Sequence, residues 1–195
     1  MALERGGLMI KHSDNPIAIQ SKKWFLAALL QLMQEKQFDN ITIGELAEKA
    51  DLNRSTFYRN FDHKEDVLKM YIDDMATQYI QRLQHTEELD MNKVASIFLT
   101  LVFEHKFFIA TLKKHGLSTL LLDSFNMHLP KIHELTKNQF PHTIRDEIAH
   151  YALAYNAGGM WNMLMMWIDK EDKDSFEDLI QAFKEISQFN AGHHS

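Results

Sequence analysis

The 195-residue chain contains no cysteine, which excludes disulfide bonds, thiolate catalysis and zinc sites with cysteine ligands. It has only 3 prolines and 7 glycines, a composition that suits an all-helical protein with short connections. No run of about 18 apolar residues is free of charges, so we expect no transmembrane helix. Residues 1–15 lack the apolar run of a signal peptide, and we expect them to be disordered. These absences favour a cytoplasmic protein.

The most informative stretch is 42–65, which contains the start signals of three helices. Thr42 followed by Glu45 is a capping box, in which a hydroxyl and a carboxylate satisfy orphan amides of the first turn. Asn53 is a favourable N-cap for a second, short helix. The pattern predicts two helices in close succession.

Only Asp51 and Leu52 lie between these two helices, which leaves room for a tight turn and nothing longer. Asp62 and Glu65 repeat the capping-box pattern and predict the start of a third helix. A helix, a tight turn and a short helix together form a helix-turn-helix.

The side chains divide this unit into a buried face and an outward face. Apolar residues that can close into one core are Ile43, Leu46, Ala47, Ala50, Leu52, Phe57 and Phe61. The polar residues left to point outward from the second helix are Arg54, Ser55, Thr56, Tyr58 and Arg59. Arginine binds guanine through two hydrogen bonds, and hydroxyls bind base edges or phosphate. Lys64 opens the third helix, where a cation gains nothing from the helix dipole unless a phosphate binds there too.

Three segments of this stretch closely resemble the N-terminal DNA-binding domain of the tetracycline-repressor (TetR) family: 43–47, 52–61 and the pair Lys64–Glu65. The spacing from the Phe-Tyr pair to Phe61 and then to Lys64 is the most specific part. The resemblance implies that the following positions contact DNA: Thr42, Asn53, Arg54, Ser55, Thr56, Tyr58, Arg59 and Lys64. The family commonly has glycine where this chain has Asp51, and aspartate tolerates the left-handed conformation of such a turn.

The net charge of −6 is unevenly distributed. Residues 1–70 hold 10 basic and 10 acidic side chains, whereas residues 71–195 hold 11 and 17. The part of the chain that holds the helix-turn-helix therefore has no net charge and lacks the basic surface typical of DNA-binding proteins. Its specificity would rest on a few well-placed contacts, with a modest non-specific background.

Ahead of the motif, Pro16 suits a first helical turn, and 17–37 reads as one amphipathic helix. Its expected apolar stripe comprises Ile19, Trp24, Ala27, Ala28, Leu30, Leu32 and Met33. Ser21, Lys22 and Lys23 are either phosphate contacts or part of a solvated face.

After the motif we expect a bundle of longer helices. One runs from Asp62 to about Gln84, and the next from Asp90 through Phe108 is apolar nearly all round. Two further helices, 117–127 and 131–140, are either separate or joined through a kink at Pro130.

The last two predicted helices are 143–168 and 175–189, separated by an acidic turn at 169–174. Gly158 and Gly159 each cost roughly 1 kcal/mol against alanine within a helix, which favours close approach of another backbone. This helix and its acidic turn resemble the C-terminal domain of a TetR subset, mostly from low-GC Gram-positive bacteria. In the family the last two long helices form a four-helix dimer interface. The residues implied for it here are Gly158, Gly159, Trp161, Met165, Phe176, Leu179 and Phe183.

A group of aromatic residues in this part exceeds what a small bundle needs: Phe103, Phe107, Phe108, Phe125, Tyr151, Tyr155, Trp161 and Trp167. His105, Asn126 and Asn156 are available as polar anchors. Pockets between bundle helices are usually apolar with a few polar groups, so we expect a small apolar or aromatic effector whose lining residues stay unassigned.

Catalytic and metal-binding patterns are weak. The chain has no glycine-rich phosphate loop after a strand, no Gly-x-Ser-x-Gly elbow and no His-Glu-x-x-His sequence. His142, Asp146 and His150 share a helix face, but ligands eight residues apart span about 12 Å of helix axis and cannot hold one metal. We therefore expect no enzyme, no metal and no cofactor.

The sequence thus predicts an all-α protein: a segment 1–15, a three-helix helix-turn-helix domain at 16–66, and a helical domain for dimerisation and ligand sensing at 67–195. The favoured function is a homodimeric repressor that binds a near-palindromic operator on double-stranded DNA and is released by the effector. One alternative is a co-activator or sensor subunit whose C-terminal domain binds a partner protein. Another is an interaction module that reuses the fold without DNA.

Overall fold

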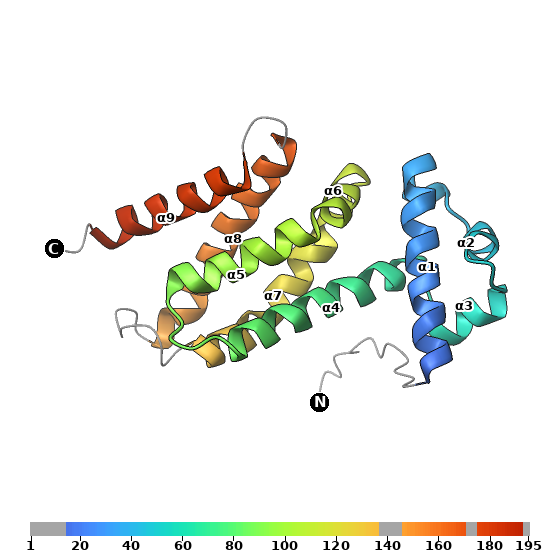
Figure 1. Cartoon of the computed structure of the whole chain (residues 1–195), viewed down its shortest axis with the longest axis horizontal. Helices are drawn as coiled ribbons and strands as arrows, with labels where there is room; N and C mark the ends of the chain where they lie inside the picture. Colours follow the sequence, from blue (N-terminus) through green and yellow to red (C-terminus); the bar gives the residue numbers. More distant parts are fainter. Residues whose placement is uncertain (1–14, 137–145, 171–174, 193–195) are drawn as a thin grey trace, which may run out of the picture. The chain divides into compact units, whose positions relative to one another are not determined.

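The computed structural model describes residues 15–136, 146–170 and 175–192 (Figure 1). The expectations for residues 1–14, most of the acidic turn at 169–174 and His142 concern residues outside that part. Every regular element in the described part is helical, so the all-α prediction is confirmed. The chain divides into two compact units, the first ending at Asp73 and the second beginning at Asp74.

In its described residues the first unit holds four α-helices and one 3-10 helix, and the last α-helix continues past the unit's end. Its elements are α1 (Pro16–Glu35), the 3-10 helix η1 (Phe38–Asn40), α2 (Ile43–Lys49), α3 (Arg54–Asn60) and α4 (Lys64–Gln84). Both α2 and α3 pack against α1 and against each other (Figure 1). The helices predicted at 17–37, after Thr42 and after Asn53 are all present.

Local signals begin these helices as the sequence indicates. Pro16 stands in the first turn of α1, and the Asn15 side chain accepts a hydrogen bond from the Ile17 N–H at 3.0 Å. The start of α4 differs from the prediction, because the helix begins at Lys64 and its reciprocal carboxylate is Asp66. This carboxylate accepts from the N–H groups of Asp62 and His63 at 3.2 and 2.8 Å. The capping pattern therefore lies one residue further along than Asp62 and Glu65 suggested.

Three phenylalanines form the centre of the first unit. The ring of Phe25 lies 5.3 Å from that of Phe57 and 6.1 Å from that of Phe61, both edge to face. Phe57 and Phe61 lie 5.6 Å apart. Each such pair contributes about 0.5–1.5 kcal/mol beyond the area it buries. This cluster ties α1 to α3 and fixes which face of α3 is turned inward.

The buried stripe of α1 is rotated from the predicted one. Ala28, Leu32 and Met33 are buried as expected, but Ile19, Trp24 and Ala27 are exposed. The residues that complete the stripe are Phe25 and Leu29. Long apolar runs in α1 offer several possible faces, and only the partners from α2 and α3 decide between them.

The second unit, where the structure describes it, contains the end of α4 and five further helices. These are α5 (Met91–Glu104), α6 (Lys106–Lys114), α7 (Ser118–Thr136), α8 (Asp146–Asp169) and α9 (Phe176–Gly192). α5 packs against α9 and α7 against α8, while α6 contacts both α5 and α7. α7 is continuous through Pro130, so a single joined helix replaces the alternative of two separate helices.

The single helix predicted from Asp90 through Phe108 is wrong. It breaks at His105, where φ is −106° and ψ is 16°, into α5 and α6, whose axes differ by 72°. The bend lets one continuous apolar run serve two neighbours, because α5 packs against α9 and α6 against α7. Among the described helices none is by itself long and apolar enough to cross a membrane; α5 and α6 taken as a bent pair meet that length and composition.

Aromatic side chains of the second unit form two clusters. Phe103 stacks on Phe176 with ring centres 4.5 Å apart, and Trp167 lies within 6.2 Å of both rings. In the other cluster, Phe98 lies 4.8 Å from Phe125 and 5.7 Å from Tyr79. The Tyr79 hydroxyl donates to the Val94 carbonyl at 3.2 Å, and burial raises the pKa of this phenol.

The proposed polar anchors do not join these clusters as a set. Asn126 and Asn156 are exposed, and the Asn156 amide donates to the carbonyl of Ala152 on its own helix. His105 is partly buried, and this burial lowers the pKa of its imidazole. Only His105 among the three is therefore placed near the interior of the second unit.

Candidate nucleic-acid interface

The turn between α2 and α3 is a Schellman motif built around Asp51. The Leu52 N–H bonds the Ala47 carbonyl at 2.9 Å, and the Asp51 N–H bonds the Glu48 carbonyl at 3.0 Å. These two bonds satisfy carbonyls that the end of α2 would otherwise leave open. Asp51 has a φ of 53°, so the left-handed conformation predicted for it is confirmed.

α3 has two distinct faces. Thr56, Phe57 and Asn60 are buried, whereas Arg54, Ser55, Tyr58 and Arg59 are exposed. The exposed positions are two i, i+4 pairs, which lie on one side of a helix. Tyr58 is 52% exposed, so the structure places a large aromatic side chain on this outward face. α3 is thus a short helix with a fixed inner face and a polar outer face.

Thr56 differs from its prediction, because the residue is only 8% exposed and its side chain is hydrogen-bonded within the first unit. Its hydroxyl donates to the Asn53 side-chain oxygen at 2.9 Å and accepts from the Arg59 guanidinium at 3.0 Å. The Asn53 oxygen also accepts from the Thr56 N–H at 2.8 Å and so caps α3. Asn53, Thr56 and Arg59 form one network, in which Thr56 holds the arginine instead of facing a base.

Thr42 is exposed and caps α2 through the predicted box. The Glu45 N–H donates to the Thr42 hydroxyl oxygen at 3.2 Å, and Glu45 accepts from the Thr42 N–H at 2.9 Å. Lys36 adds an ion pair to the same carboxylate, which the sequence analysis missed. The hydrogen bond from Lys36 and those from Thr42 hold the pKa of Glu45 at about 2, against an ordinary value of 4.5.

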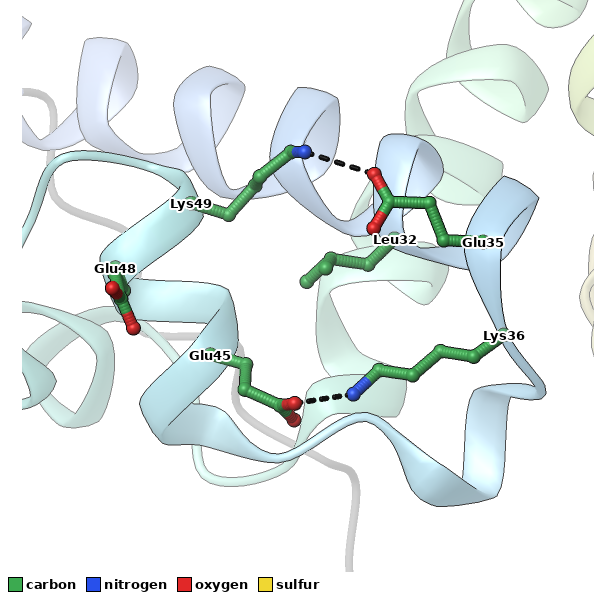
Figure 2. Close-up of a pocket in the computed structure, with 6 residues that line it drawn as sticks. All are labelled: Leu32, Glu35, Lys36, Glu45, Glu48 and Lys49. Carbon is green, nitrogen blue, oxygen red and sulfur yellow. Dashed lines mark hydrogen bonds and ion pairs between the residues drawn. The ribbon is translucent and has the colours of Figure 1, made fainter.

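A surface pocket lies between the end of α1 and α2 (Figure 2). Its lining residues are Leu32, Glu35, Lys36, Glu45, Glu48 and Lys49. Two ion pairs cross it from helix to helix, Lys36 with Glu45 and Lys49 with Glu35, the latter at 2.9 Å. Five of the six lining residues are charged, so this pocket does not have the apolar lining expected for an effector. The two ion pairs across it link α2 to the end of α1.

Lys64 is directed into the protein. Its ammonium donates to the carbonyls of Phe38, Asp39 and Ile41 at 2.7, 3.1 and 3.0 Å. The same group lies 4.5 Å from the centre of the Phe38 ring. A lysine has three donors, and here all three are engaged. The structure therefore joins Lys64 to the connection between α1 and α2, in an arrangement different from the phosphate contact expected from sequence.

The serine and the two lysines near the start of α1 differ in their exposure to solvent. Ser21 and Lys22 are buried, and the Ser21 hydroxyl donates to the Ile17 carbonyl at 2.8 Å. Lys23 is exposed. Of these three candidates for phosphate contact, only Lys23 therefore has a side chain that faces solvent.

The residues implied for a dimer interface fall into two groups. Leu179 is 6% exposed and Phe176 packs on Phe103, so both belong to the interior of the second unit. Gly159 is exposed, and a Cβ built at Gly158 or Gly159 would have no atom within 4 Å. Trp161, Met165 and Phe183 are partly exposed. Large exposed side chains that the sequence analysis left out of this set are Tyr151, Tyr155, Met166 and Ile186.

The comparisons with known proteins agree with the geometry of the first unit. Residues 25–70 match the model of bacterial regulatory proteins of the tetR family. YxbF of Bacillus subtilis (strain 168), an uncharacterized HTH-type transcriptional regulator, is 26% identical over 170 residues. The alignment covers 82% of this chain and 42% of the relative, so the chain spans less than half the length of that protein.

Solved structures share the fold over most of the chain. Lin0861 from Listeria innocua aligns with a TM-score of 0.74 at 13% identity, over 91% of this chain and 94% of the other. The dihydroxyacetone kinase operon activator DhaS aligns with a TM-score of 0.62 at 18% identity, over 86% and 94%. Identities this low support the all-helical fold alone. The family model covers residues 25–70, which include the helix-turn-helix described above, so this part of the chain is similar to the bacterial regulatory proteins of the tetR family.

Proposed function

We propose that this protein is a homodimeric transcriptional regulator whose α3 enters the major groove of a near-palindromic operator. The observation that carries the proposal is the outer face of α3, where Arg54, Ser55, Tyr58 and Arg59 are exposed together. Arginine and hydroxyl side chains supply the donors and acceptors that read base edges. The match of residues 25–70 to a model of regulatory proteins also supports the expectation that the chain is not an enzyme.

The remaining polar groups of the helix-turn-helix domain suit the sugar-phosphate backbone better than the bases. Thr42 and Asn53 are exposed at the N-termini of α2 and α3, where helix dipoles favour a negative group. Asn53 is exposed, and because its side-chain oxygen is used in capping α3, its amide N–H groups are the donors that it can offer to a phosphate. We assign Thr42 and Asn53 to phosphate contacts, Arg54, Ser55, Tyr58 and Arg59 to the groove, and the helix-turn-helix domain to residues 16–66.

The test is selection of bound duplexes from a random DNA library by the purified full chain. A dimer with one α3 per subunit should select two inverted half-sites whose centres are one helical turn, about 34–36 Å, apart or a multiple of it. Enrichment of such a palindrome supports the proposal. No enrichment at low salt, where phosphate contacts are strongest, would overturn it.

We further propose that residues 67–195 form a dimerising domain that senses a small apolar or aromatic molecule. The clusters around Phe98 and Phe103 provide the apolar surface that such a ligand needs. The ligand must bind the DNA-free state more tightly, because equal affinity for both states shifts no population. Aromatic compounds would be screened for a shift in thermal unfolding and then for release of the selected operator. Compounds that stabilise the protein without weakening DNA binding would contradict an inducer role.

A second candidate is an activator whose C-terminal domain binds a partner protein. The observation in its favour is the likeness over most of both chains to DhaS, which is an operon activator. Transcription from the selected operator, measured with and without this protein, separates the two. Lower transcription that an effector restores supports the repressor, and higher transcription supports the activator.

A further inference from the structure

Arg54 differs from the other described arginines in the hydrogen bonds and ion pairs of its guanidinium group. Of the arginines in the described part of the chain, Arg82 pairs with Glu104 at 3.1 and 2.5 Å, and Arg59 donates to the Thr56 hydroxyl. For Arg54 the described residues provide no hydrogen bond and no ion pair. An arginine has five N–H donors in a rigid planar fork. This side chain is therefore ready for an acceptor from outside the protein.

The position of that guanidinium depends on Gly44. A Cβ added at Gly44 would lie 2.3 Å from a terminal nitrogen of Arg54, 3.0 Å from its Cζ and 3.1 Å from its Nε. All three distances are shorter than ordinary van der Waals contact. The fork of Arg54, which belongs to the first turn of α3, thus occupies the space that a side chain on α2 would fill.

Backbone conformation does not explain a glycine at position 44. Within the described residues the glycine with a positive φ is Gly116, whereas Gly44 lies in the first turn of α2 with helical neighbours. Glycine lowers the stability of a helix relative to alanine, and α2 has only seven residues. What the glycine provides is space for the guanidinium.

We propose that Gly44 is a specificity-determining residue that acts through Arg54. Because it carries no side chain, Arg54 lies against α2 and offers its fork to a base from that position. A methyl group at residue 44 would displace the fork and change the base that it meets. Gly44 received no predicted role from the sequence, although a glycine inside a short capped helix is a signal that the sequence shows. The inference rests on the proposed function and extends it.

The test is a double-mutant cycle on the full chain with Gly44→Ala, Arg54→Ala and both together. Each variant is measured against the operator selected by the unchanged protein and against operators with one base pair replaced. A bidentate arginine discriminates its base by about 5- to 150-fold, so Arg54→Ala should lose that discrimination at one base pair in each half-site. Gly44→Ala should weaken or shift discrimination at the same base pair. In the Arg54→Ala background it should have no further effect.

Controls separate displacement of Arg54 from other causes. Gly44→Ala should unfold at the same temperature as the unchanged protein or slightly higher, because alanine favours the helix. Glu48→Ala also places an alanine on α2 and should alter affinity for all operators alike. Unchanged discrimination in Gly44→Ala, or an effect that persists fully without Arg54, would overturn the inference while leaving DNA binding intact. Failure of the unchanged protein to select any DNA would instead overturn the proposed function.

Discussion

At Asp51 the chain holds an aspartate in the left-handed region, with a φ of 53°. The same two-bond motif ends α6, where Gly116 takes the position with a φ of 70°. A residue with a Cβ costs about 1–2 kcal/mol in this conformation, and aspartate at the low end of that range. Asp51→Gly should therefore raise the free energy of unfolding of the first unit by about 1 kcal/mol, measured by urea denaturation.

A control removes the charge and keeps the backbone preference. Asp51→Asn retains a side chain that tolerates a positive φ, so it should change stability much less than Asp51→Gly. If the two variants stabilise equally, the loss of a negative charge and not backbone strain explains the gain. Gly116→Ala should show the opposite effect, since nothing within 4 Å obstructs its Cβ and only the backbone conformation opposes it.

The hydrogen bonds of Lys64 lead to a second prediction about a single residue. Its ammonium holds three carbonyls of the connection between α1 and α2. Hydrogen bonds to a charged group contribute about 1.5–3 kcal/mol, so Lys64→Met should destabilise the first unit by an amount of that order. The salt dependence of DNA binding should stay the same, because no phosphate contact is lost.

The matched comparison is Lys23→Met, since Lys23 is an exposed lysine of the same unit. Loss of one phosphate contact lowers the slope of log affinity against log salt by about 0.9. Because a dimer carrying Lys23→Met loses one contact in each subunit, we expect a decrease of about 1.8 with little change in stability. A comparable decrease for Lys64→Met would contradict this expectation and support the phosphate contact that the sequence suggested for Lys64.

At the scale of elements, the attachment of α2 to α1 should depend on pH. Bonds from Lys36 and Thr42 lower the pKa of Glu45 from 4.5 to about 2. A depressed carboxylate pKa stabilises the fold above the unfolded value and loses this contribution as pH falls toward the folded one. Glu45→Gln should therefore lower the melting temperature most above about pH 4.5, and the difference should vanish near pH 2.

Glu48→Gln provides the control for this experiment. Glu48 lines the same pocket in Figure 2 but makes no ion pair within the described residues. Its replacement should shift the melting temperature little, and by a similar amount across the pH range. A pH dependence in Glu45→Gln equal to that of the unchanged protein would show that the ion pair with Lys36 does not stabilise α2.

Local signals made some elements predictable and left others open. Thr42, Asn53 and Asp51 act through bonds to neighbours within a few residues, so the sequence alone identified two caps and a turn. The break at His105 carries no proline or glycine and arises from packing of α5 and α6 on different helices.

In the candidate DNA interface, too, contacts between residues far apart in the sequence could not be predicted. Thr56 has the chemistry of a base-contacting residue, but burial of α3 against Phe25 and Phe61 turns it inward. Lys64 reaches residues more than twenty positions away, and Arg54 meets a glycine ten positions earlier. Side-chain types and spacing indicated which helix faces outward. They did not show which polar groups the fold itself uses.

At the scale of the whole molecule, α8 presents a stripe of side chains that the described residues of the second unit leave exposed. Tyr151, Tyr155, Gly159, Asn162 and Met166 recur at three and four residues, and all five are exposed. Tyr155 is 75% exposed and Met166 is 59% exposed. Tyrosine and methionine are enriched where protein interfaces are buried. The stripe therefore suits contact with a second copy of the chain, with the glycine at its middle.

Gly159→Leu tests this dimer. A Cβ there would meet no atom of a neighbouring element within 4 Å in the described part of the protomer, and position 159 is exposed, so the variant should fold with a nearly unchanged melting temperature at low concentration. If α8 helices from two copies approach closely at this position, the leucine should prevent it and give monomers in sedimentation velocity. DNA binding should then fall sharply, because one α3 contacts only one half-site. Gly159→Ala, with a single methyl group, should weaken association less. A dimer of Gly159→Leu as tight as that of the unchanged protein would exclude α8 at Gly159 from the contact.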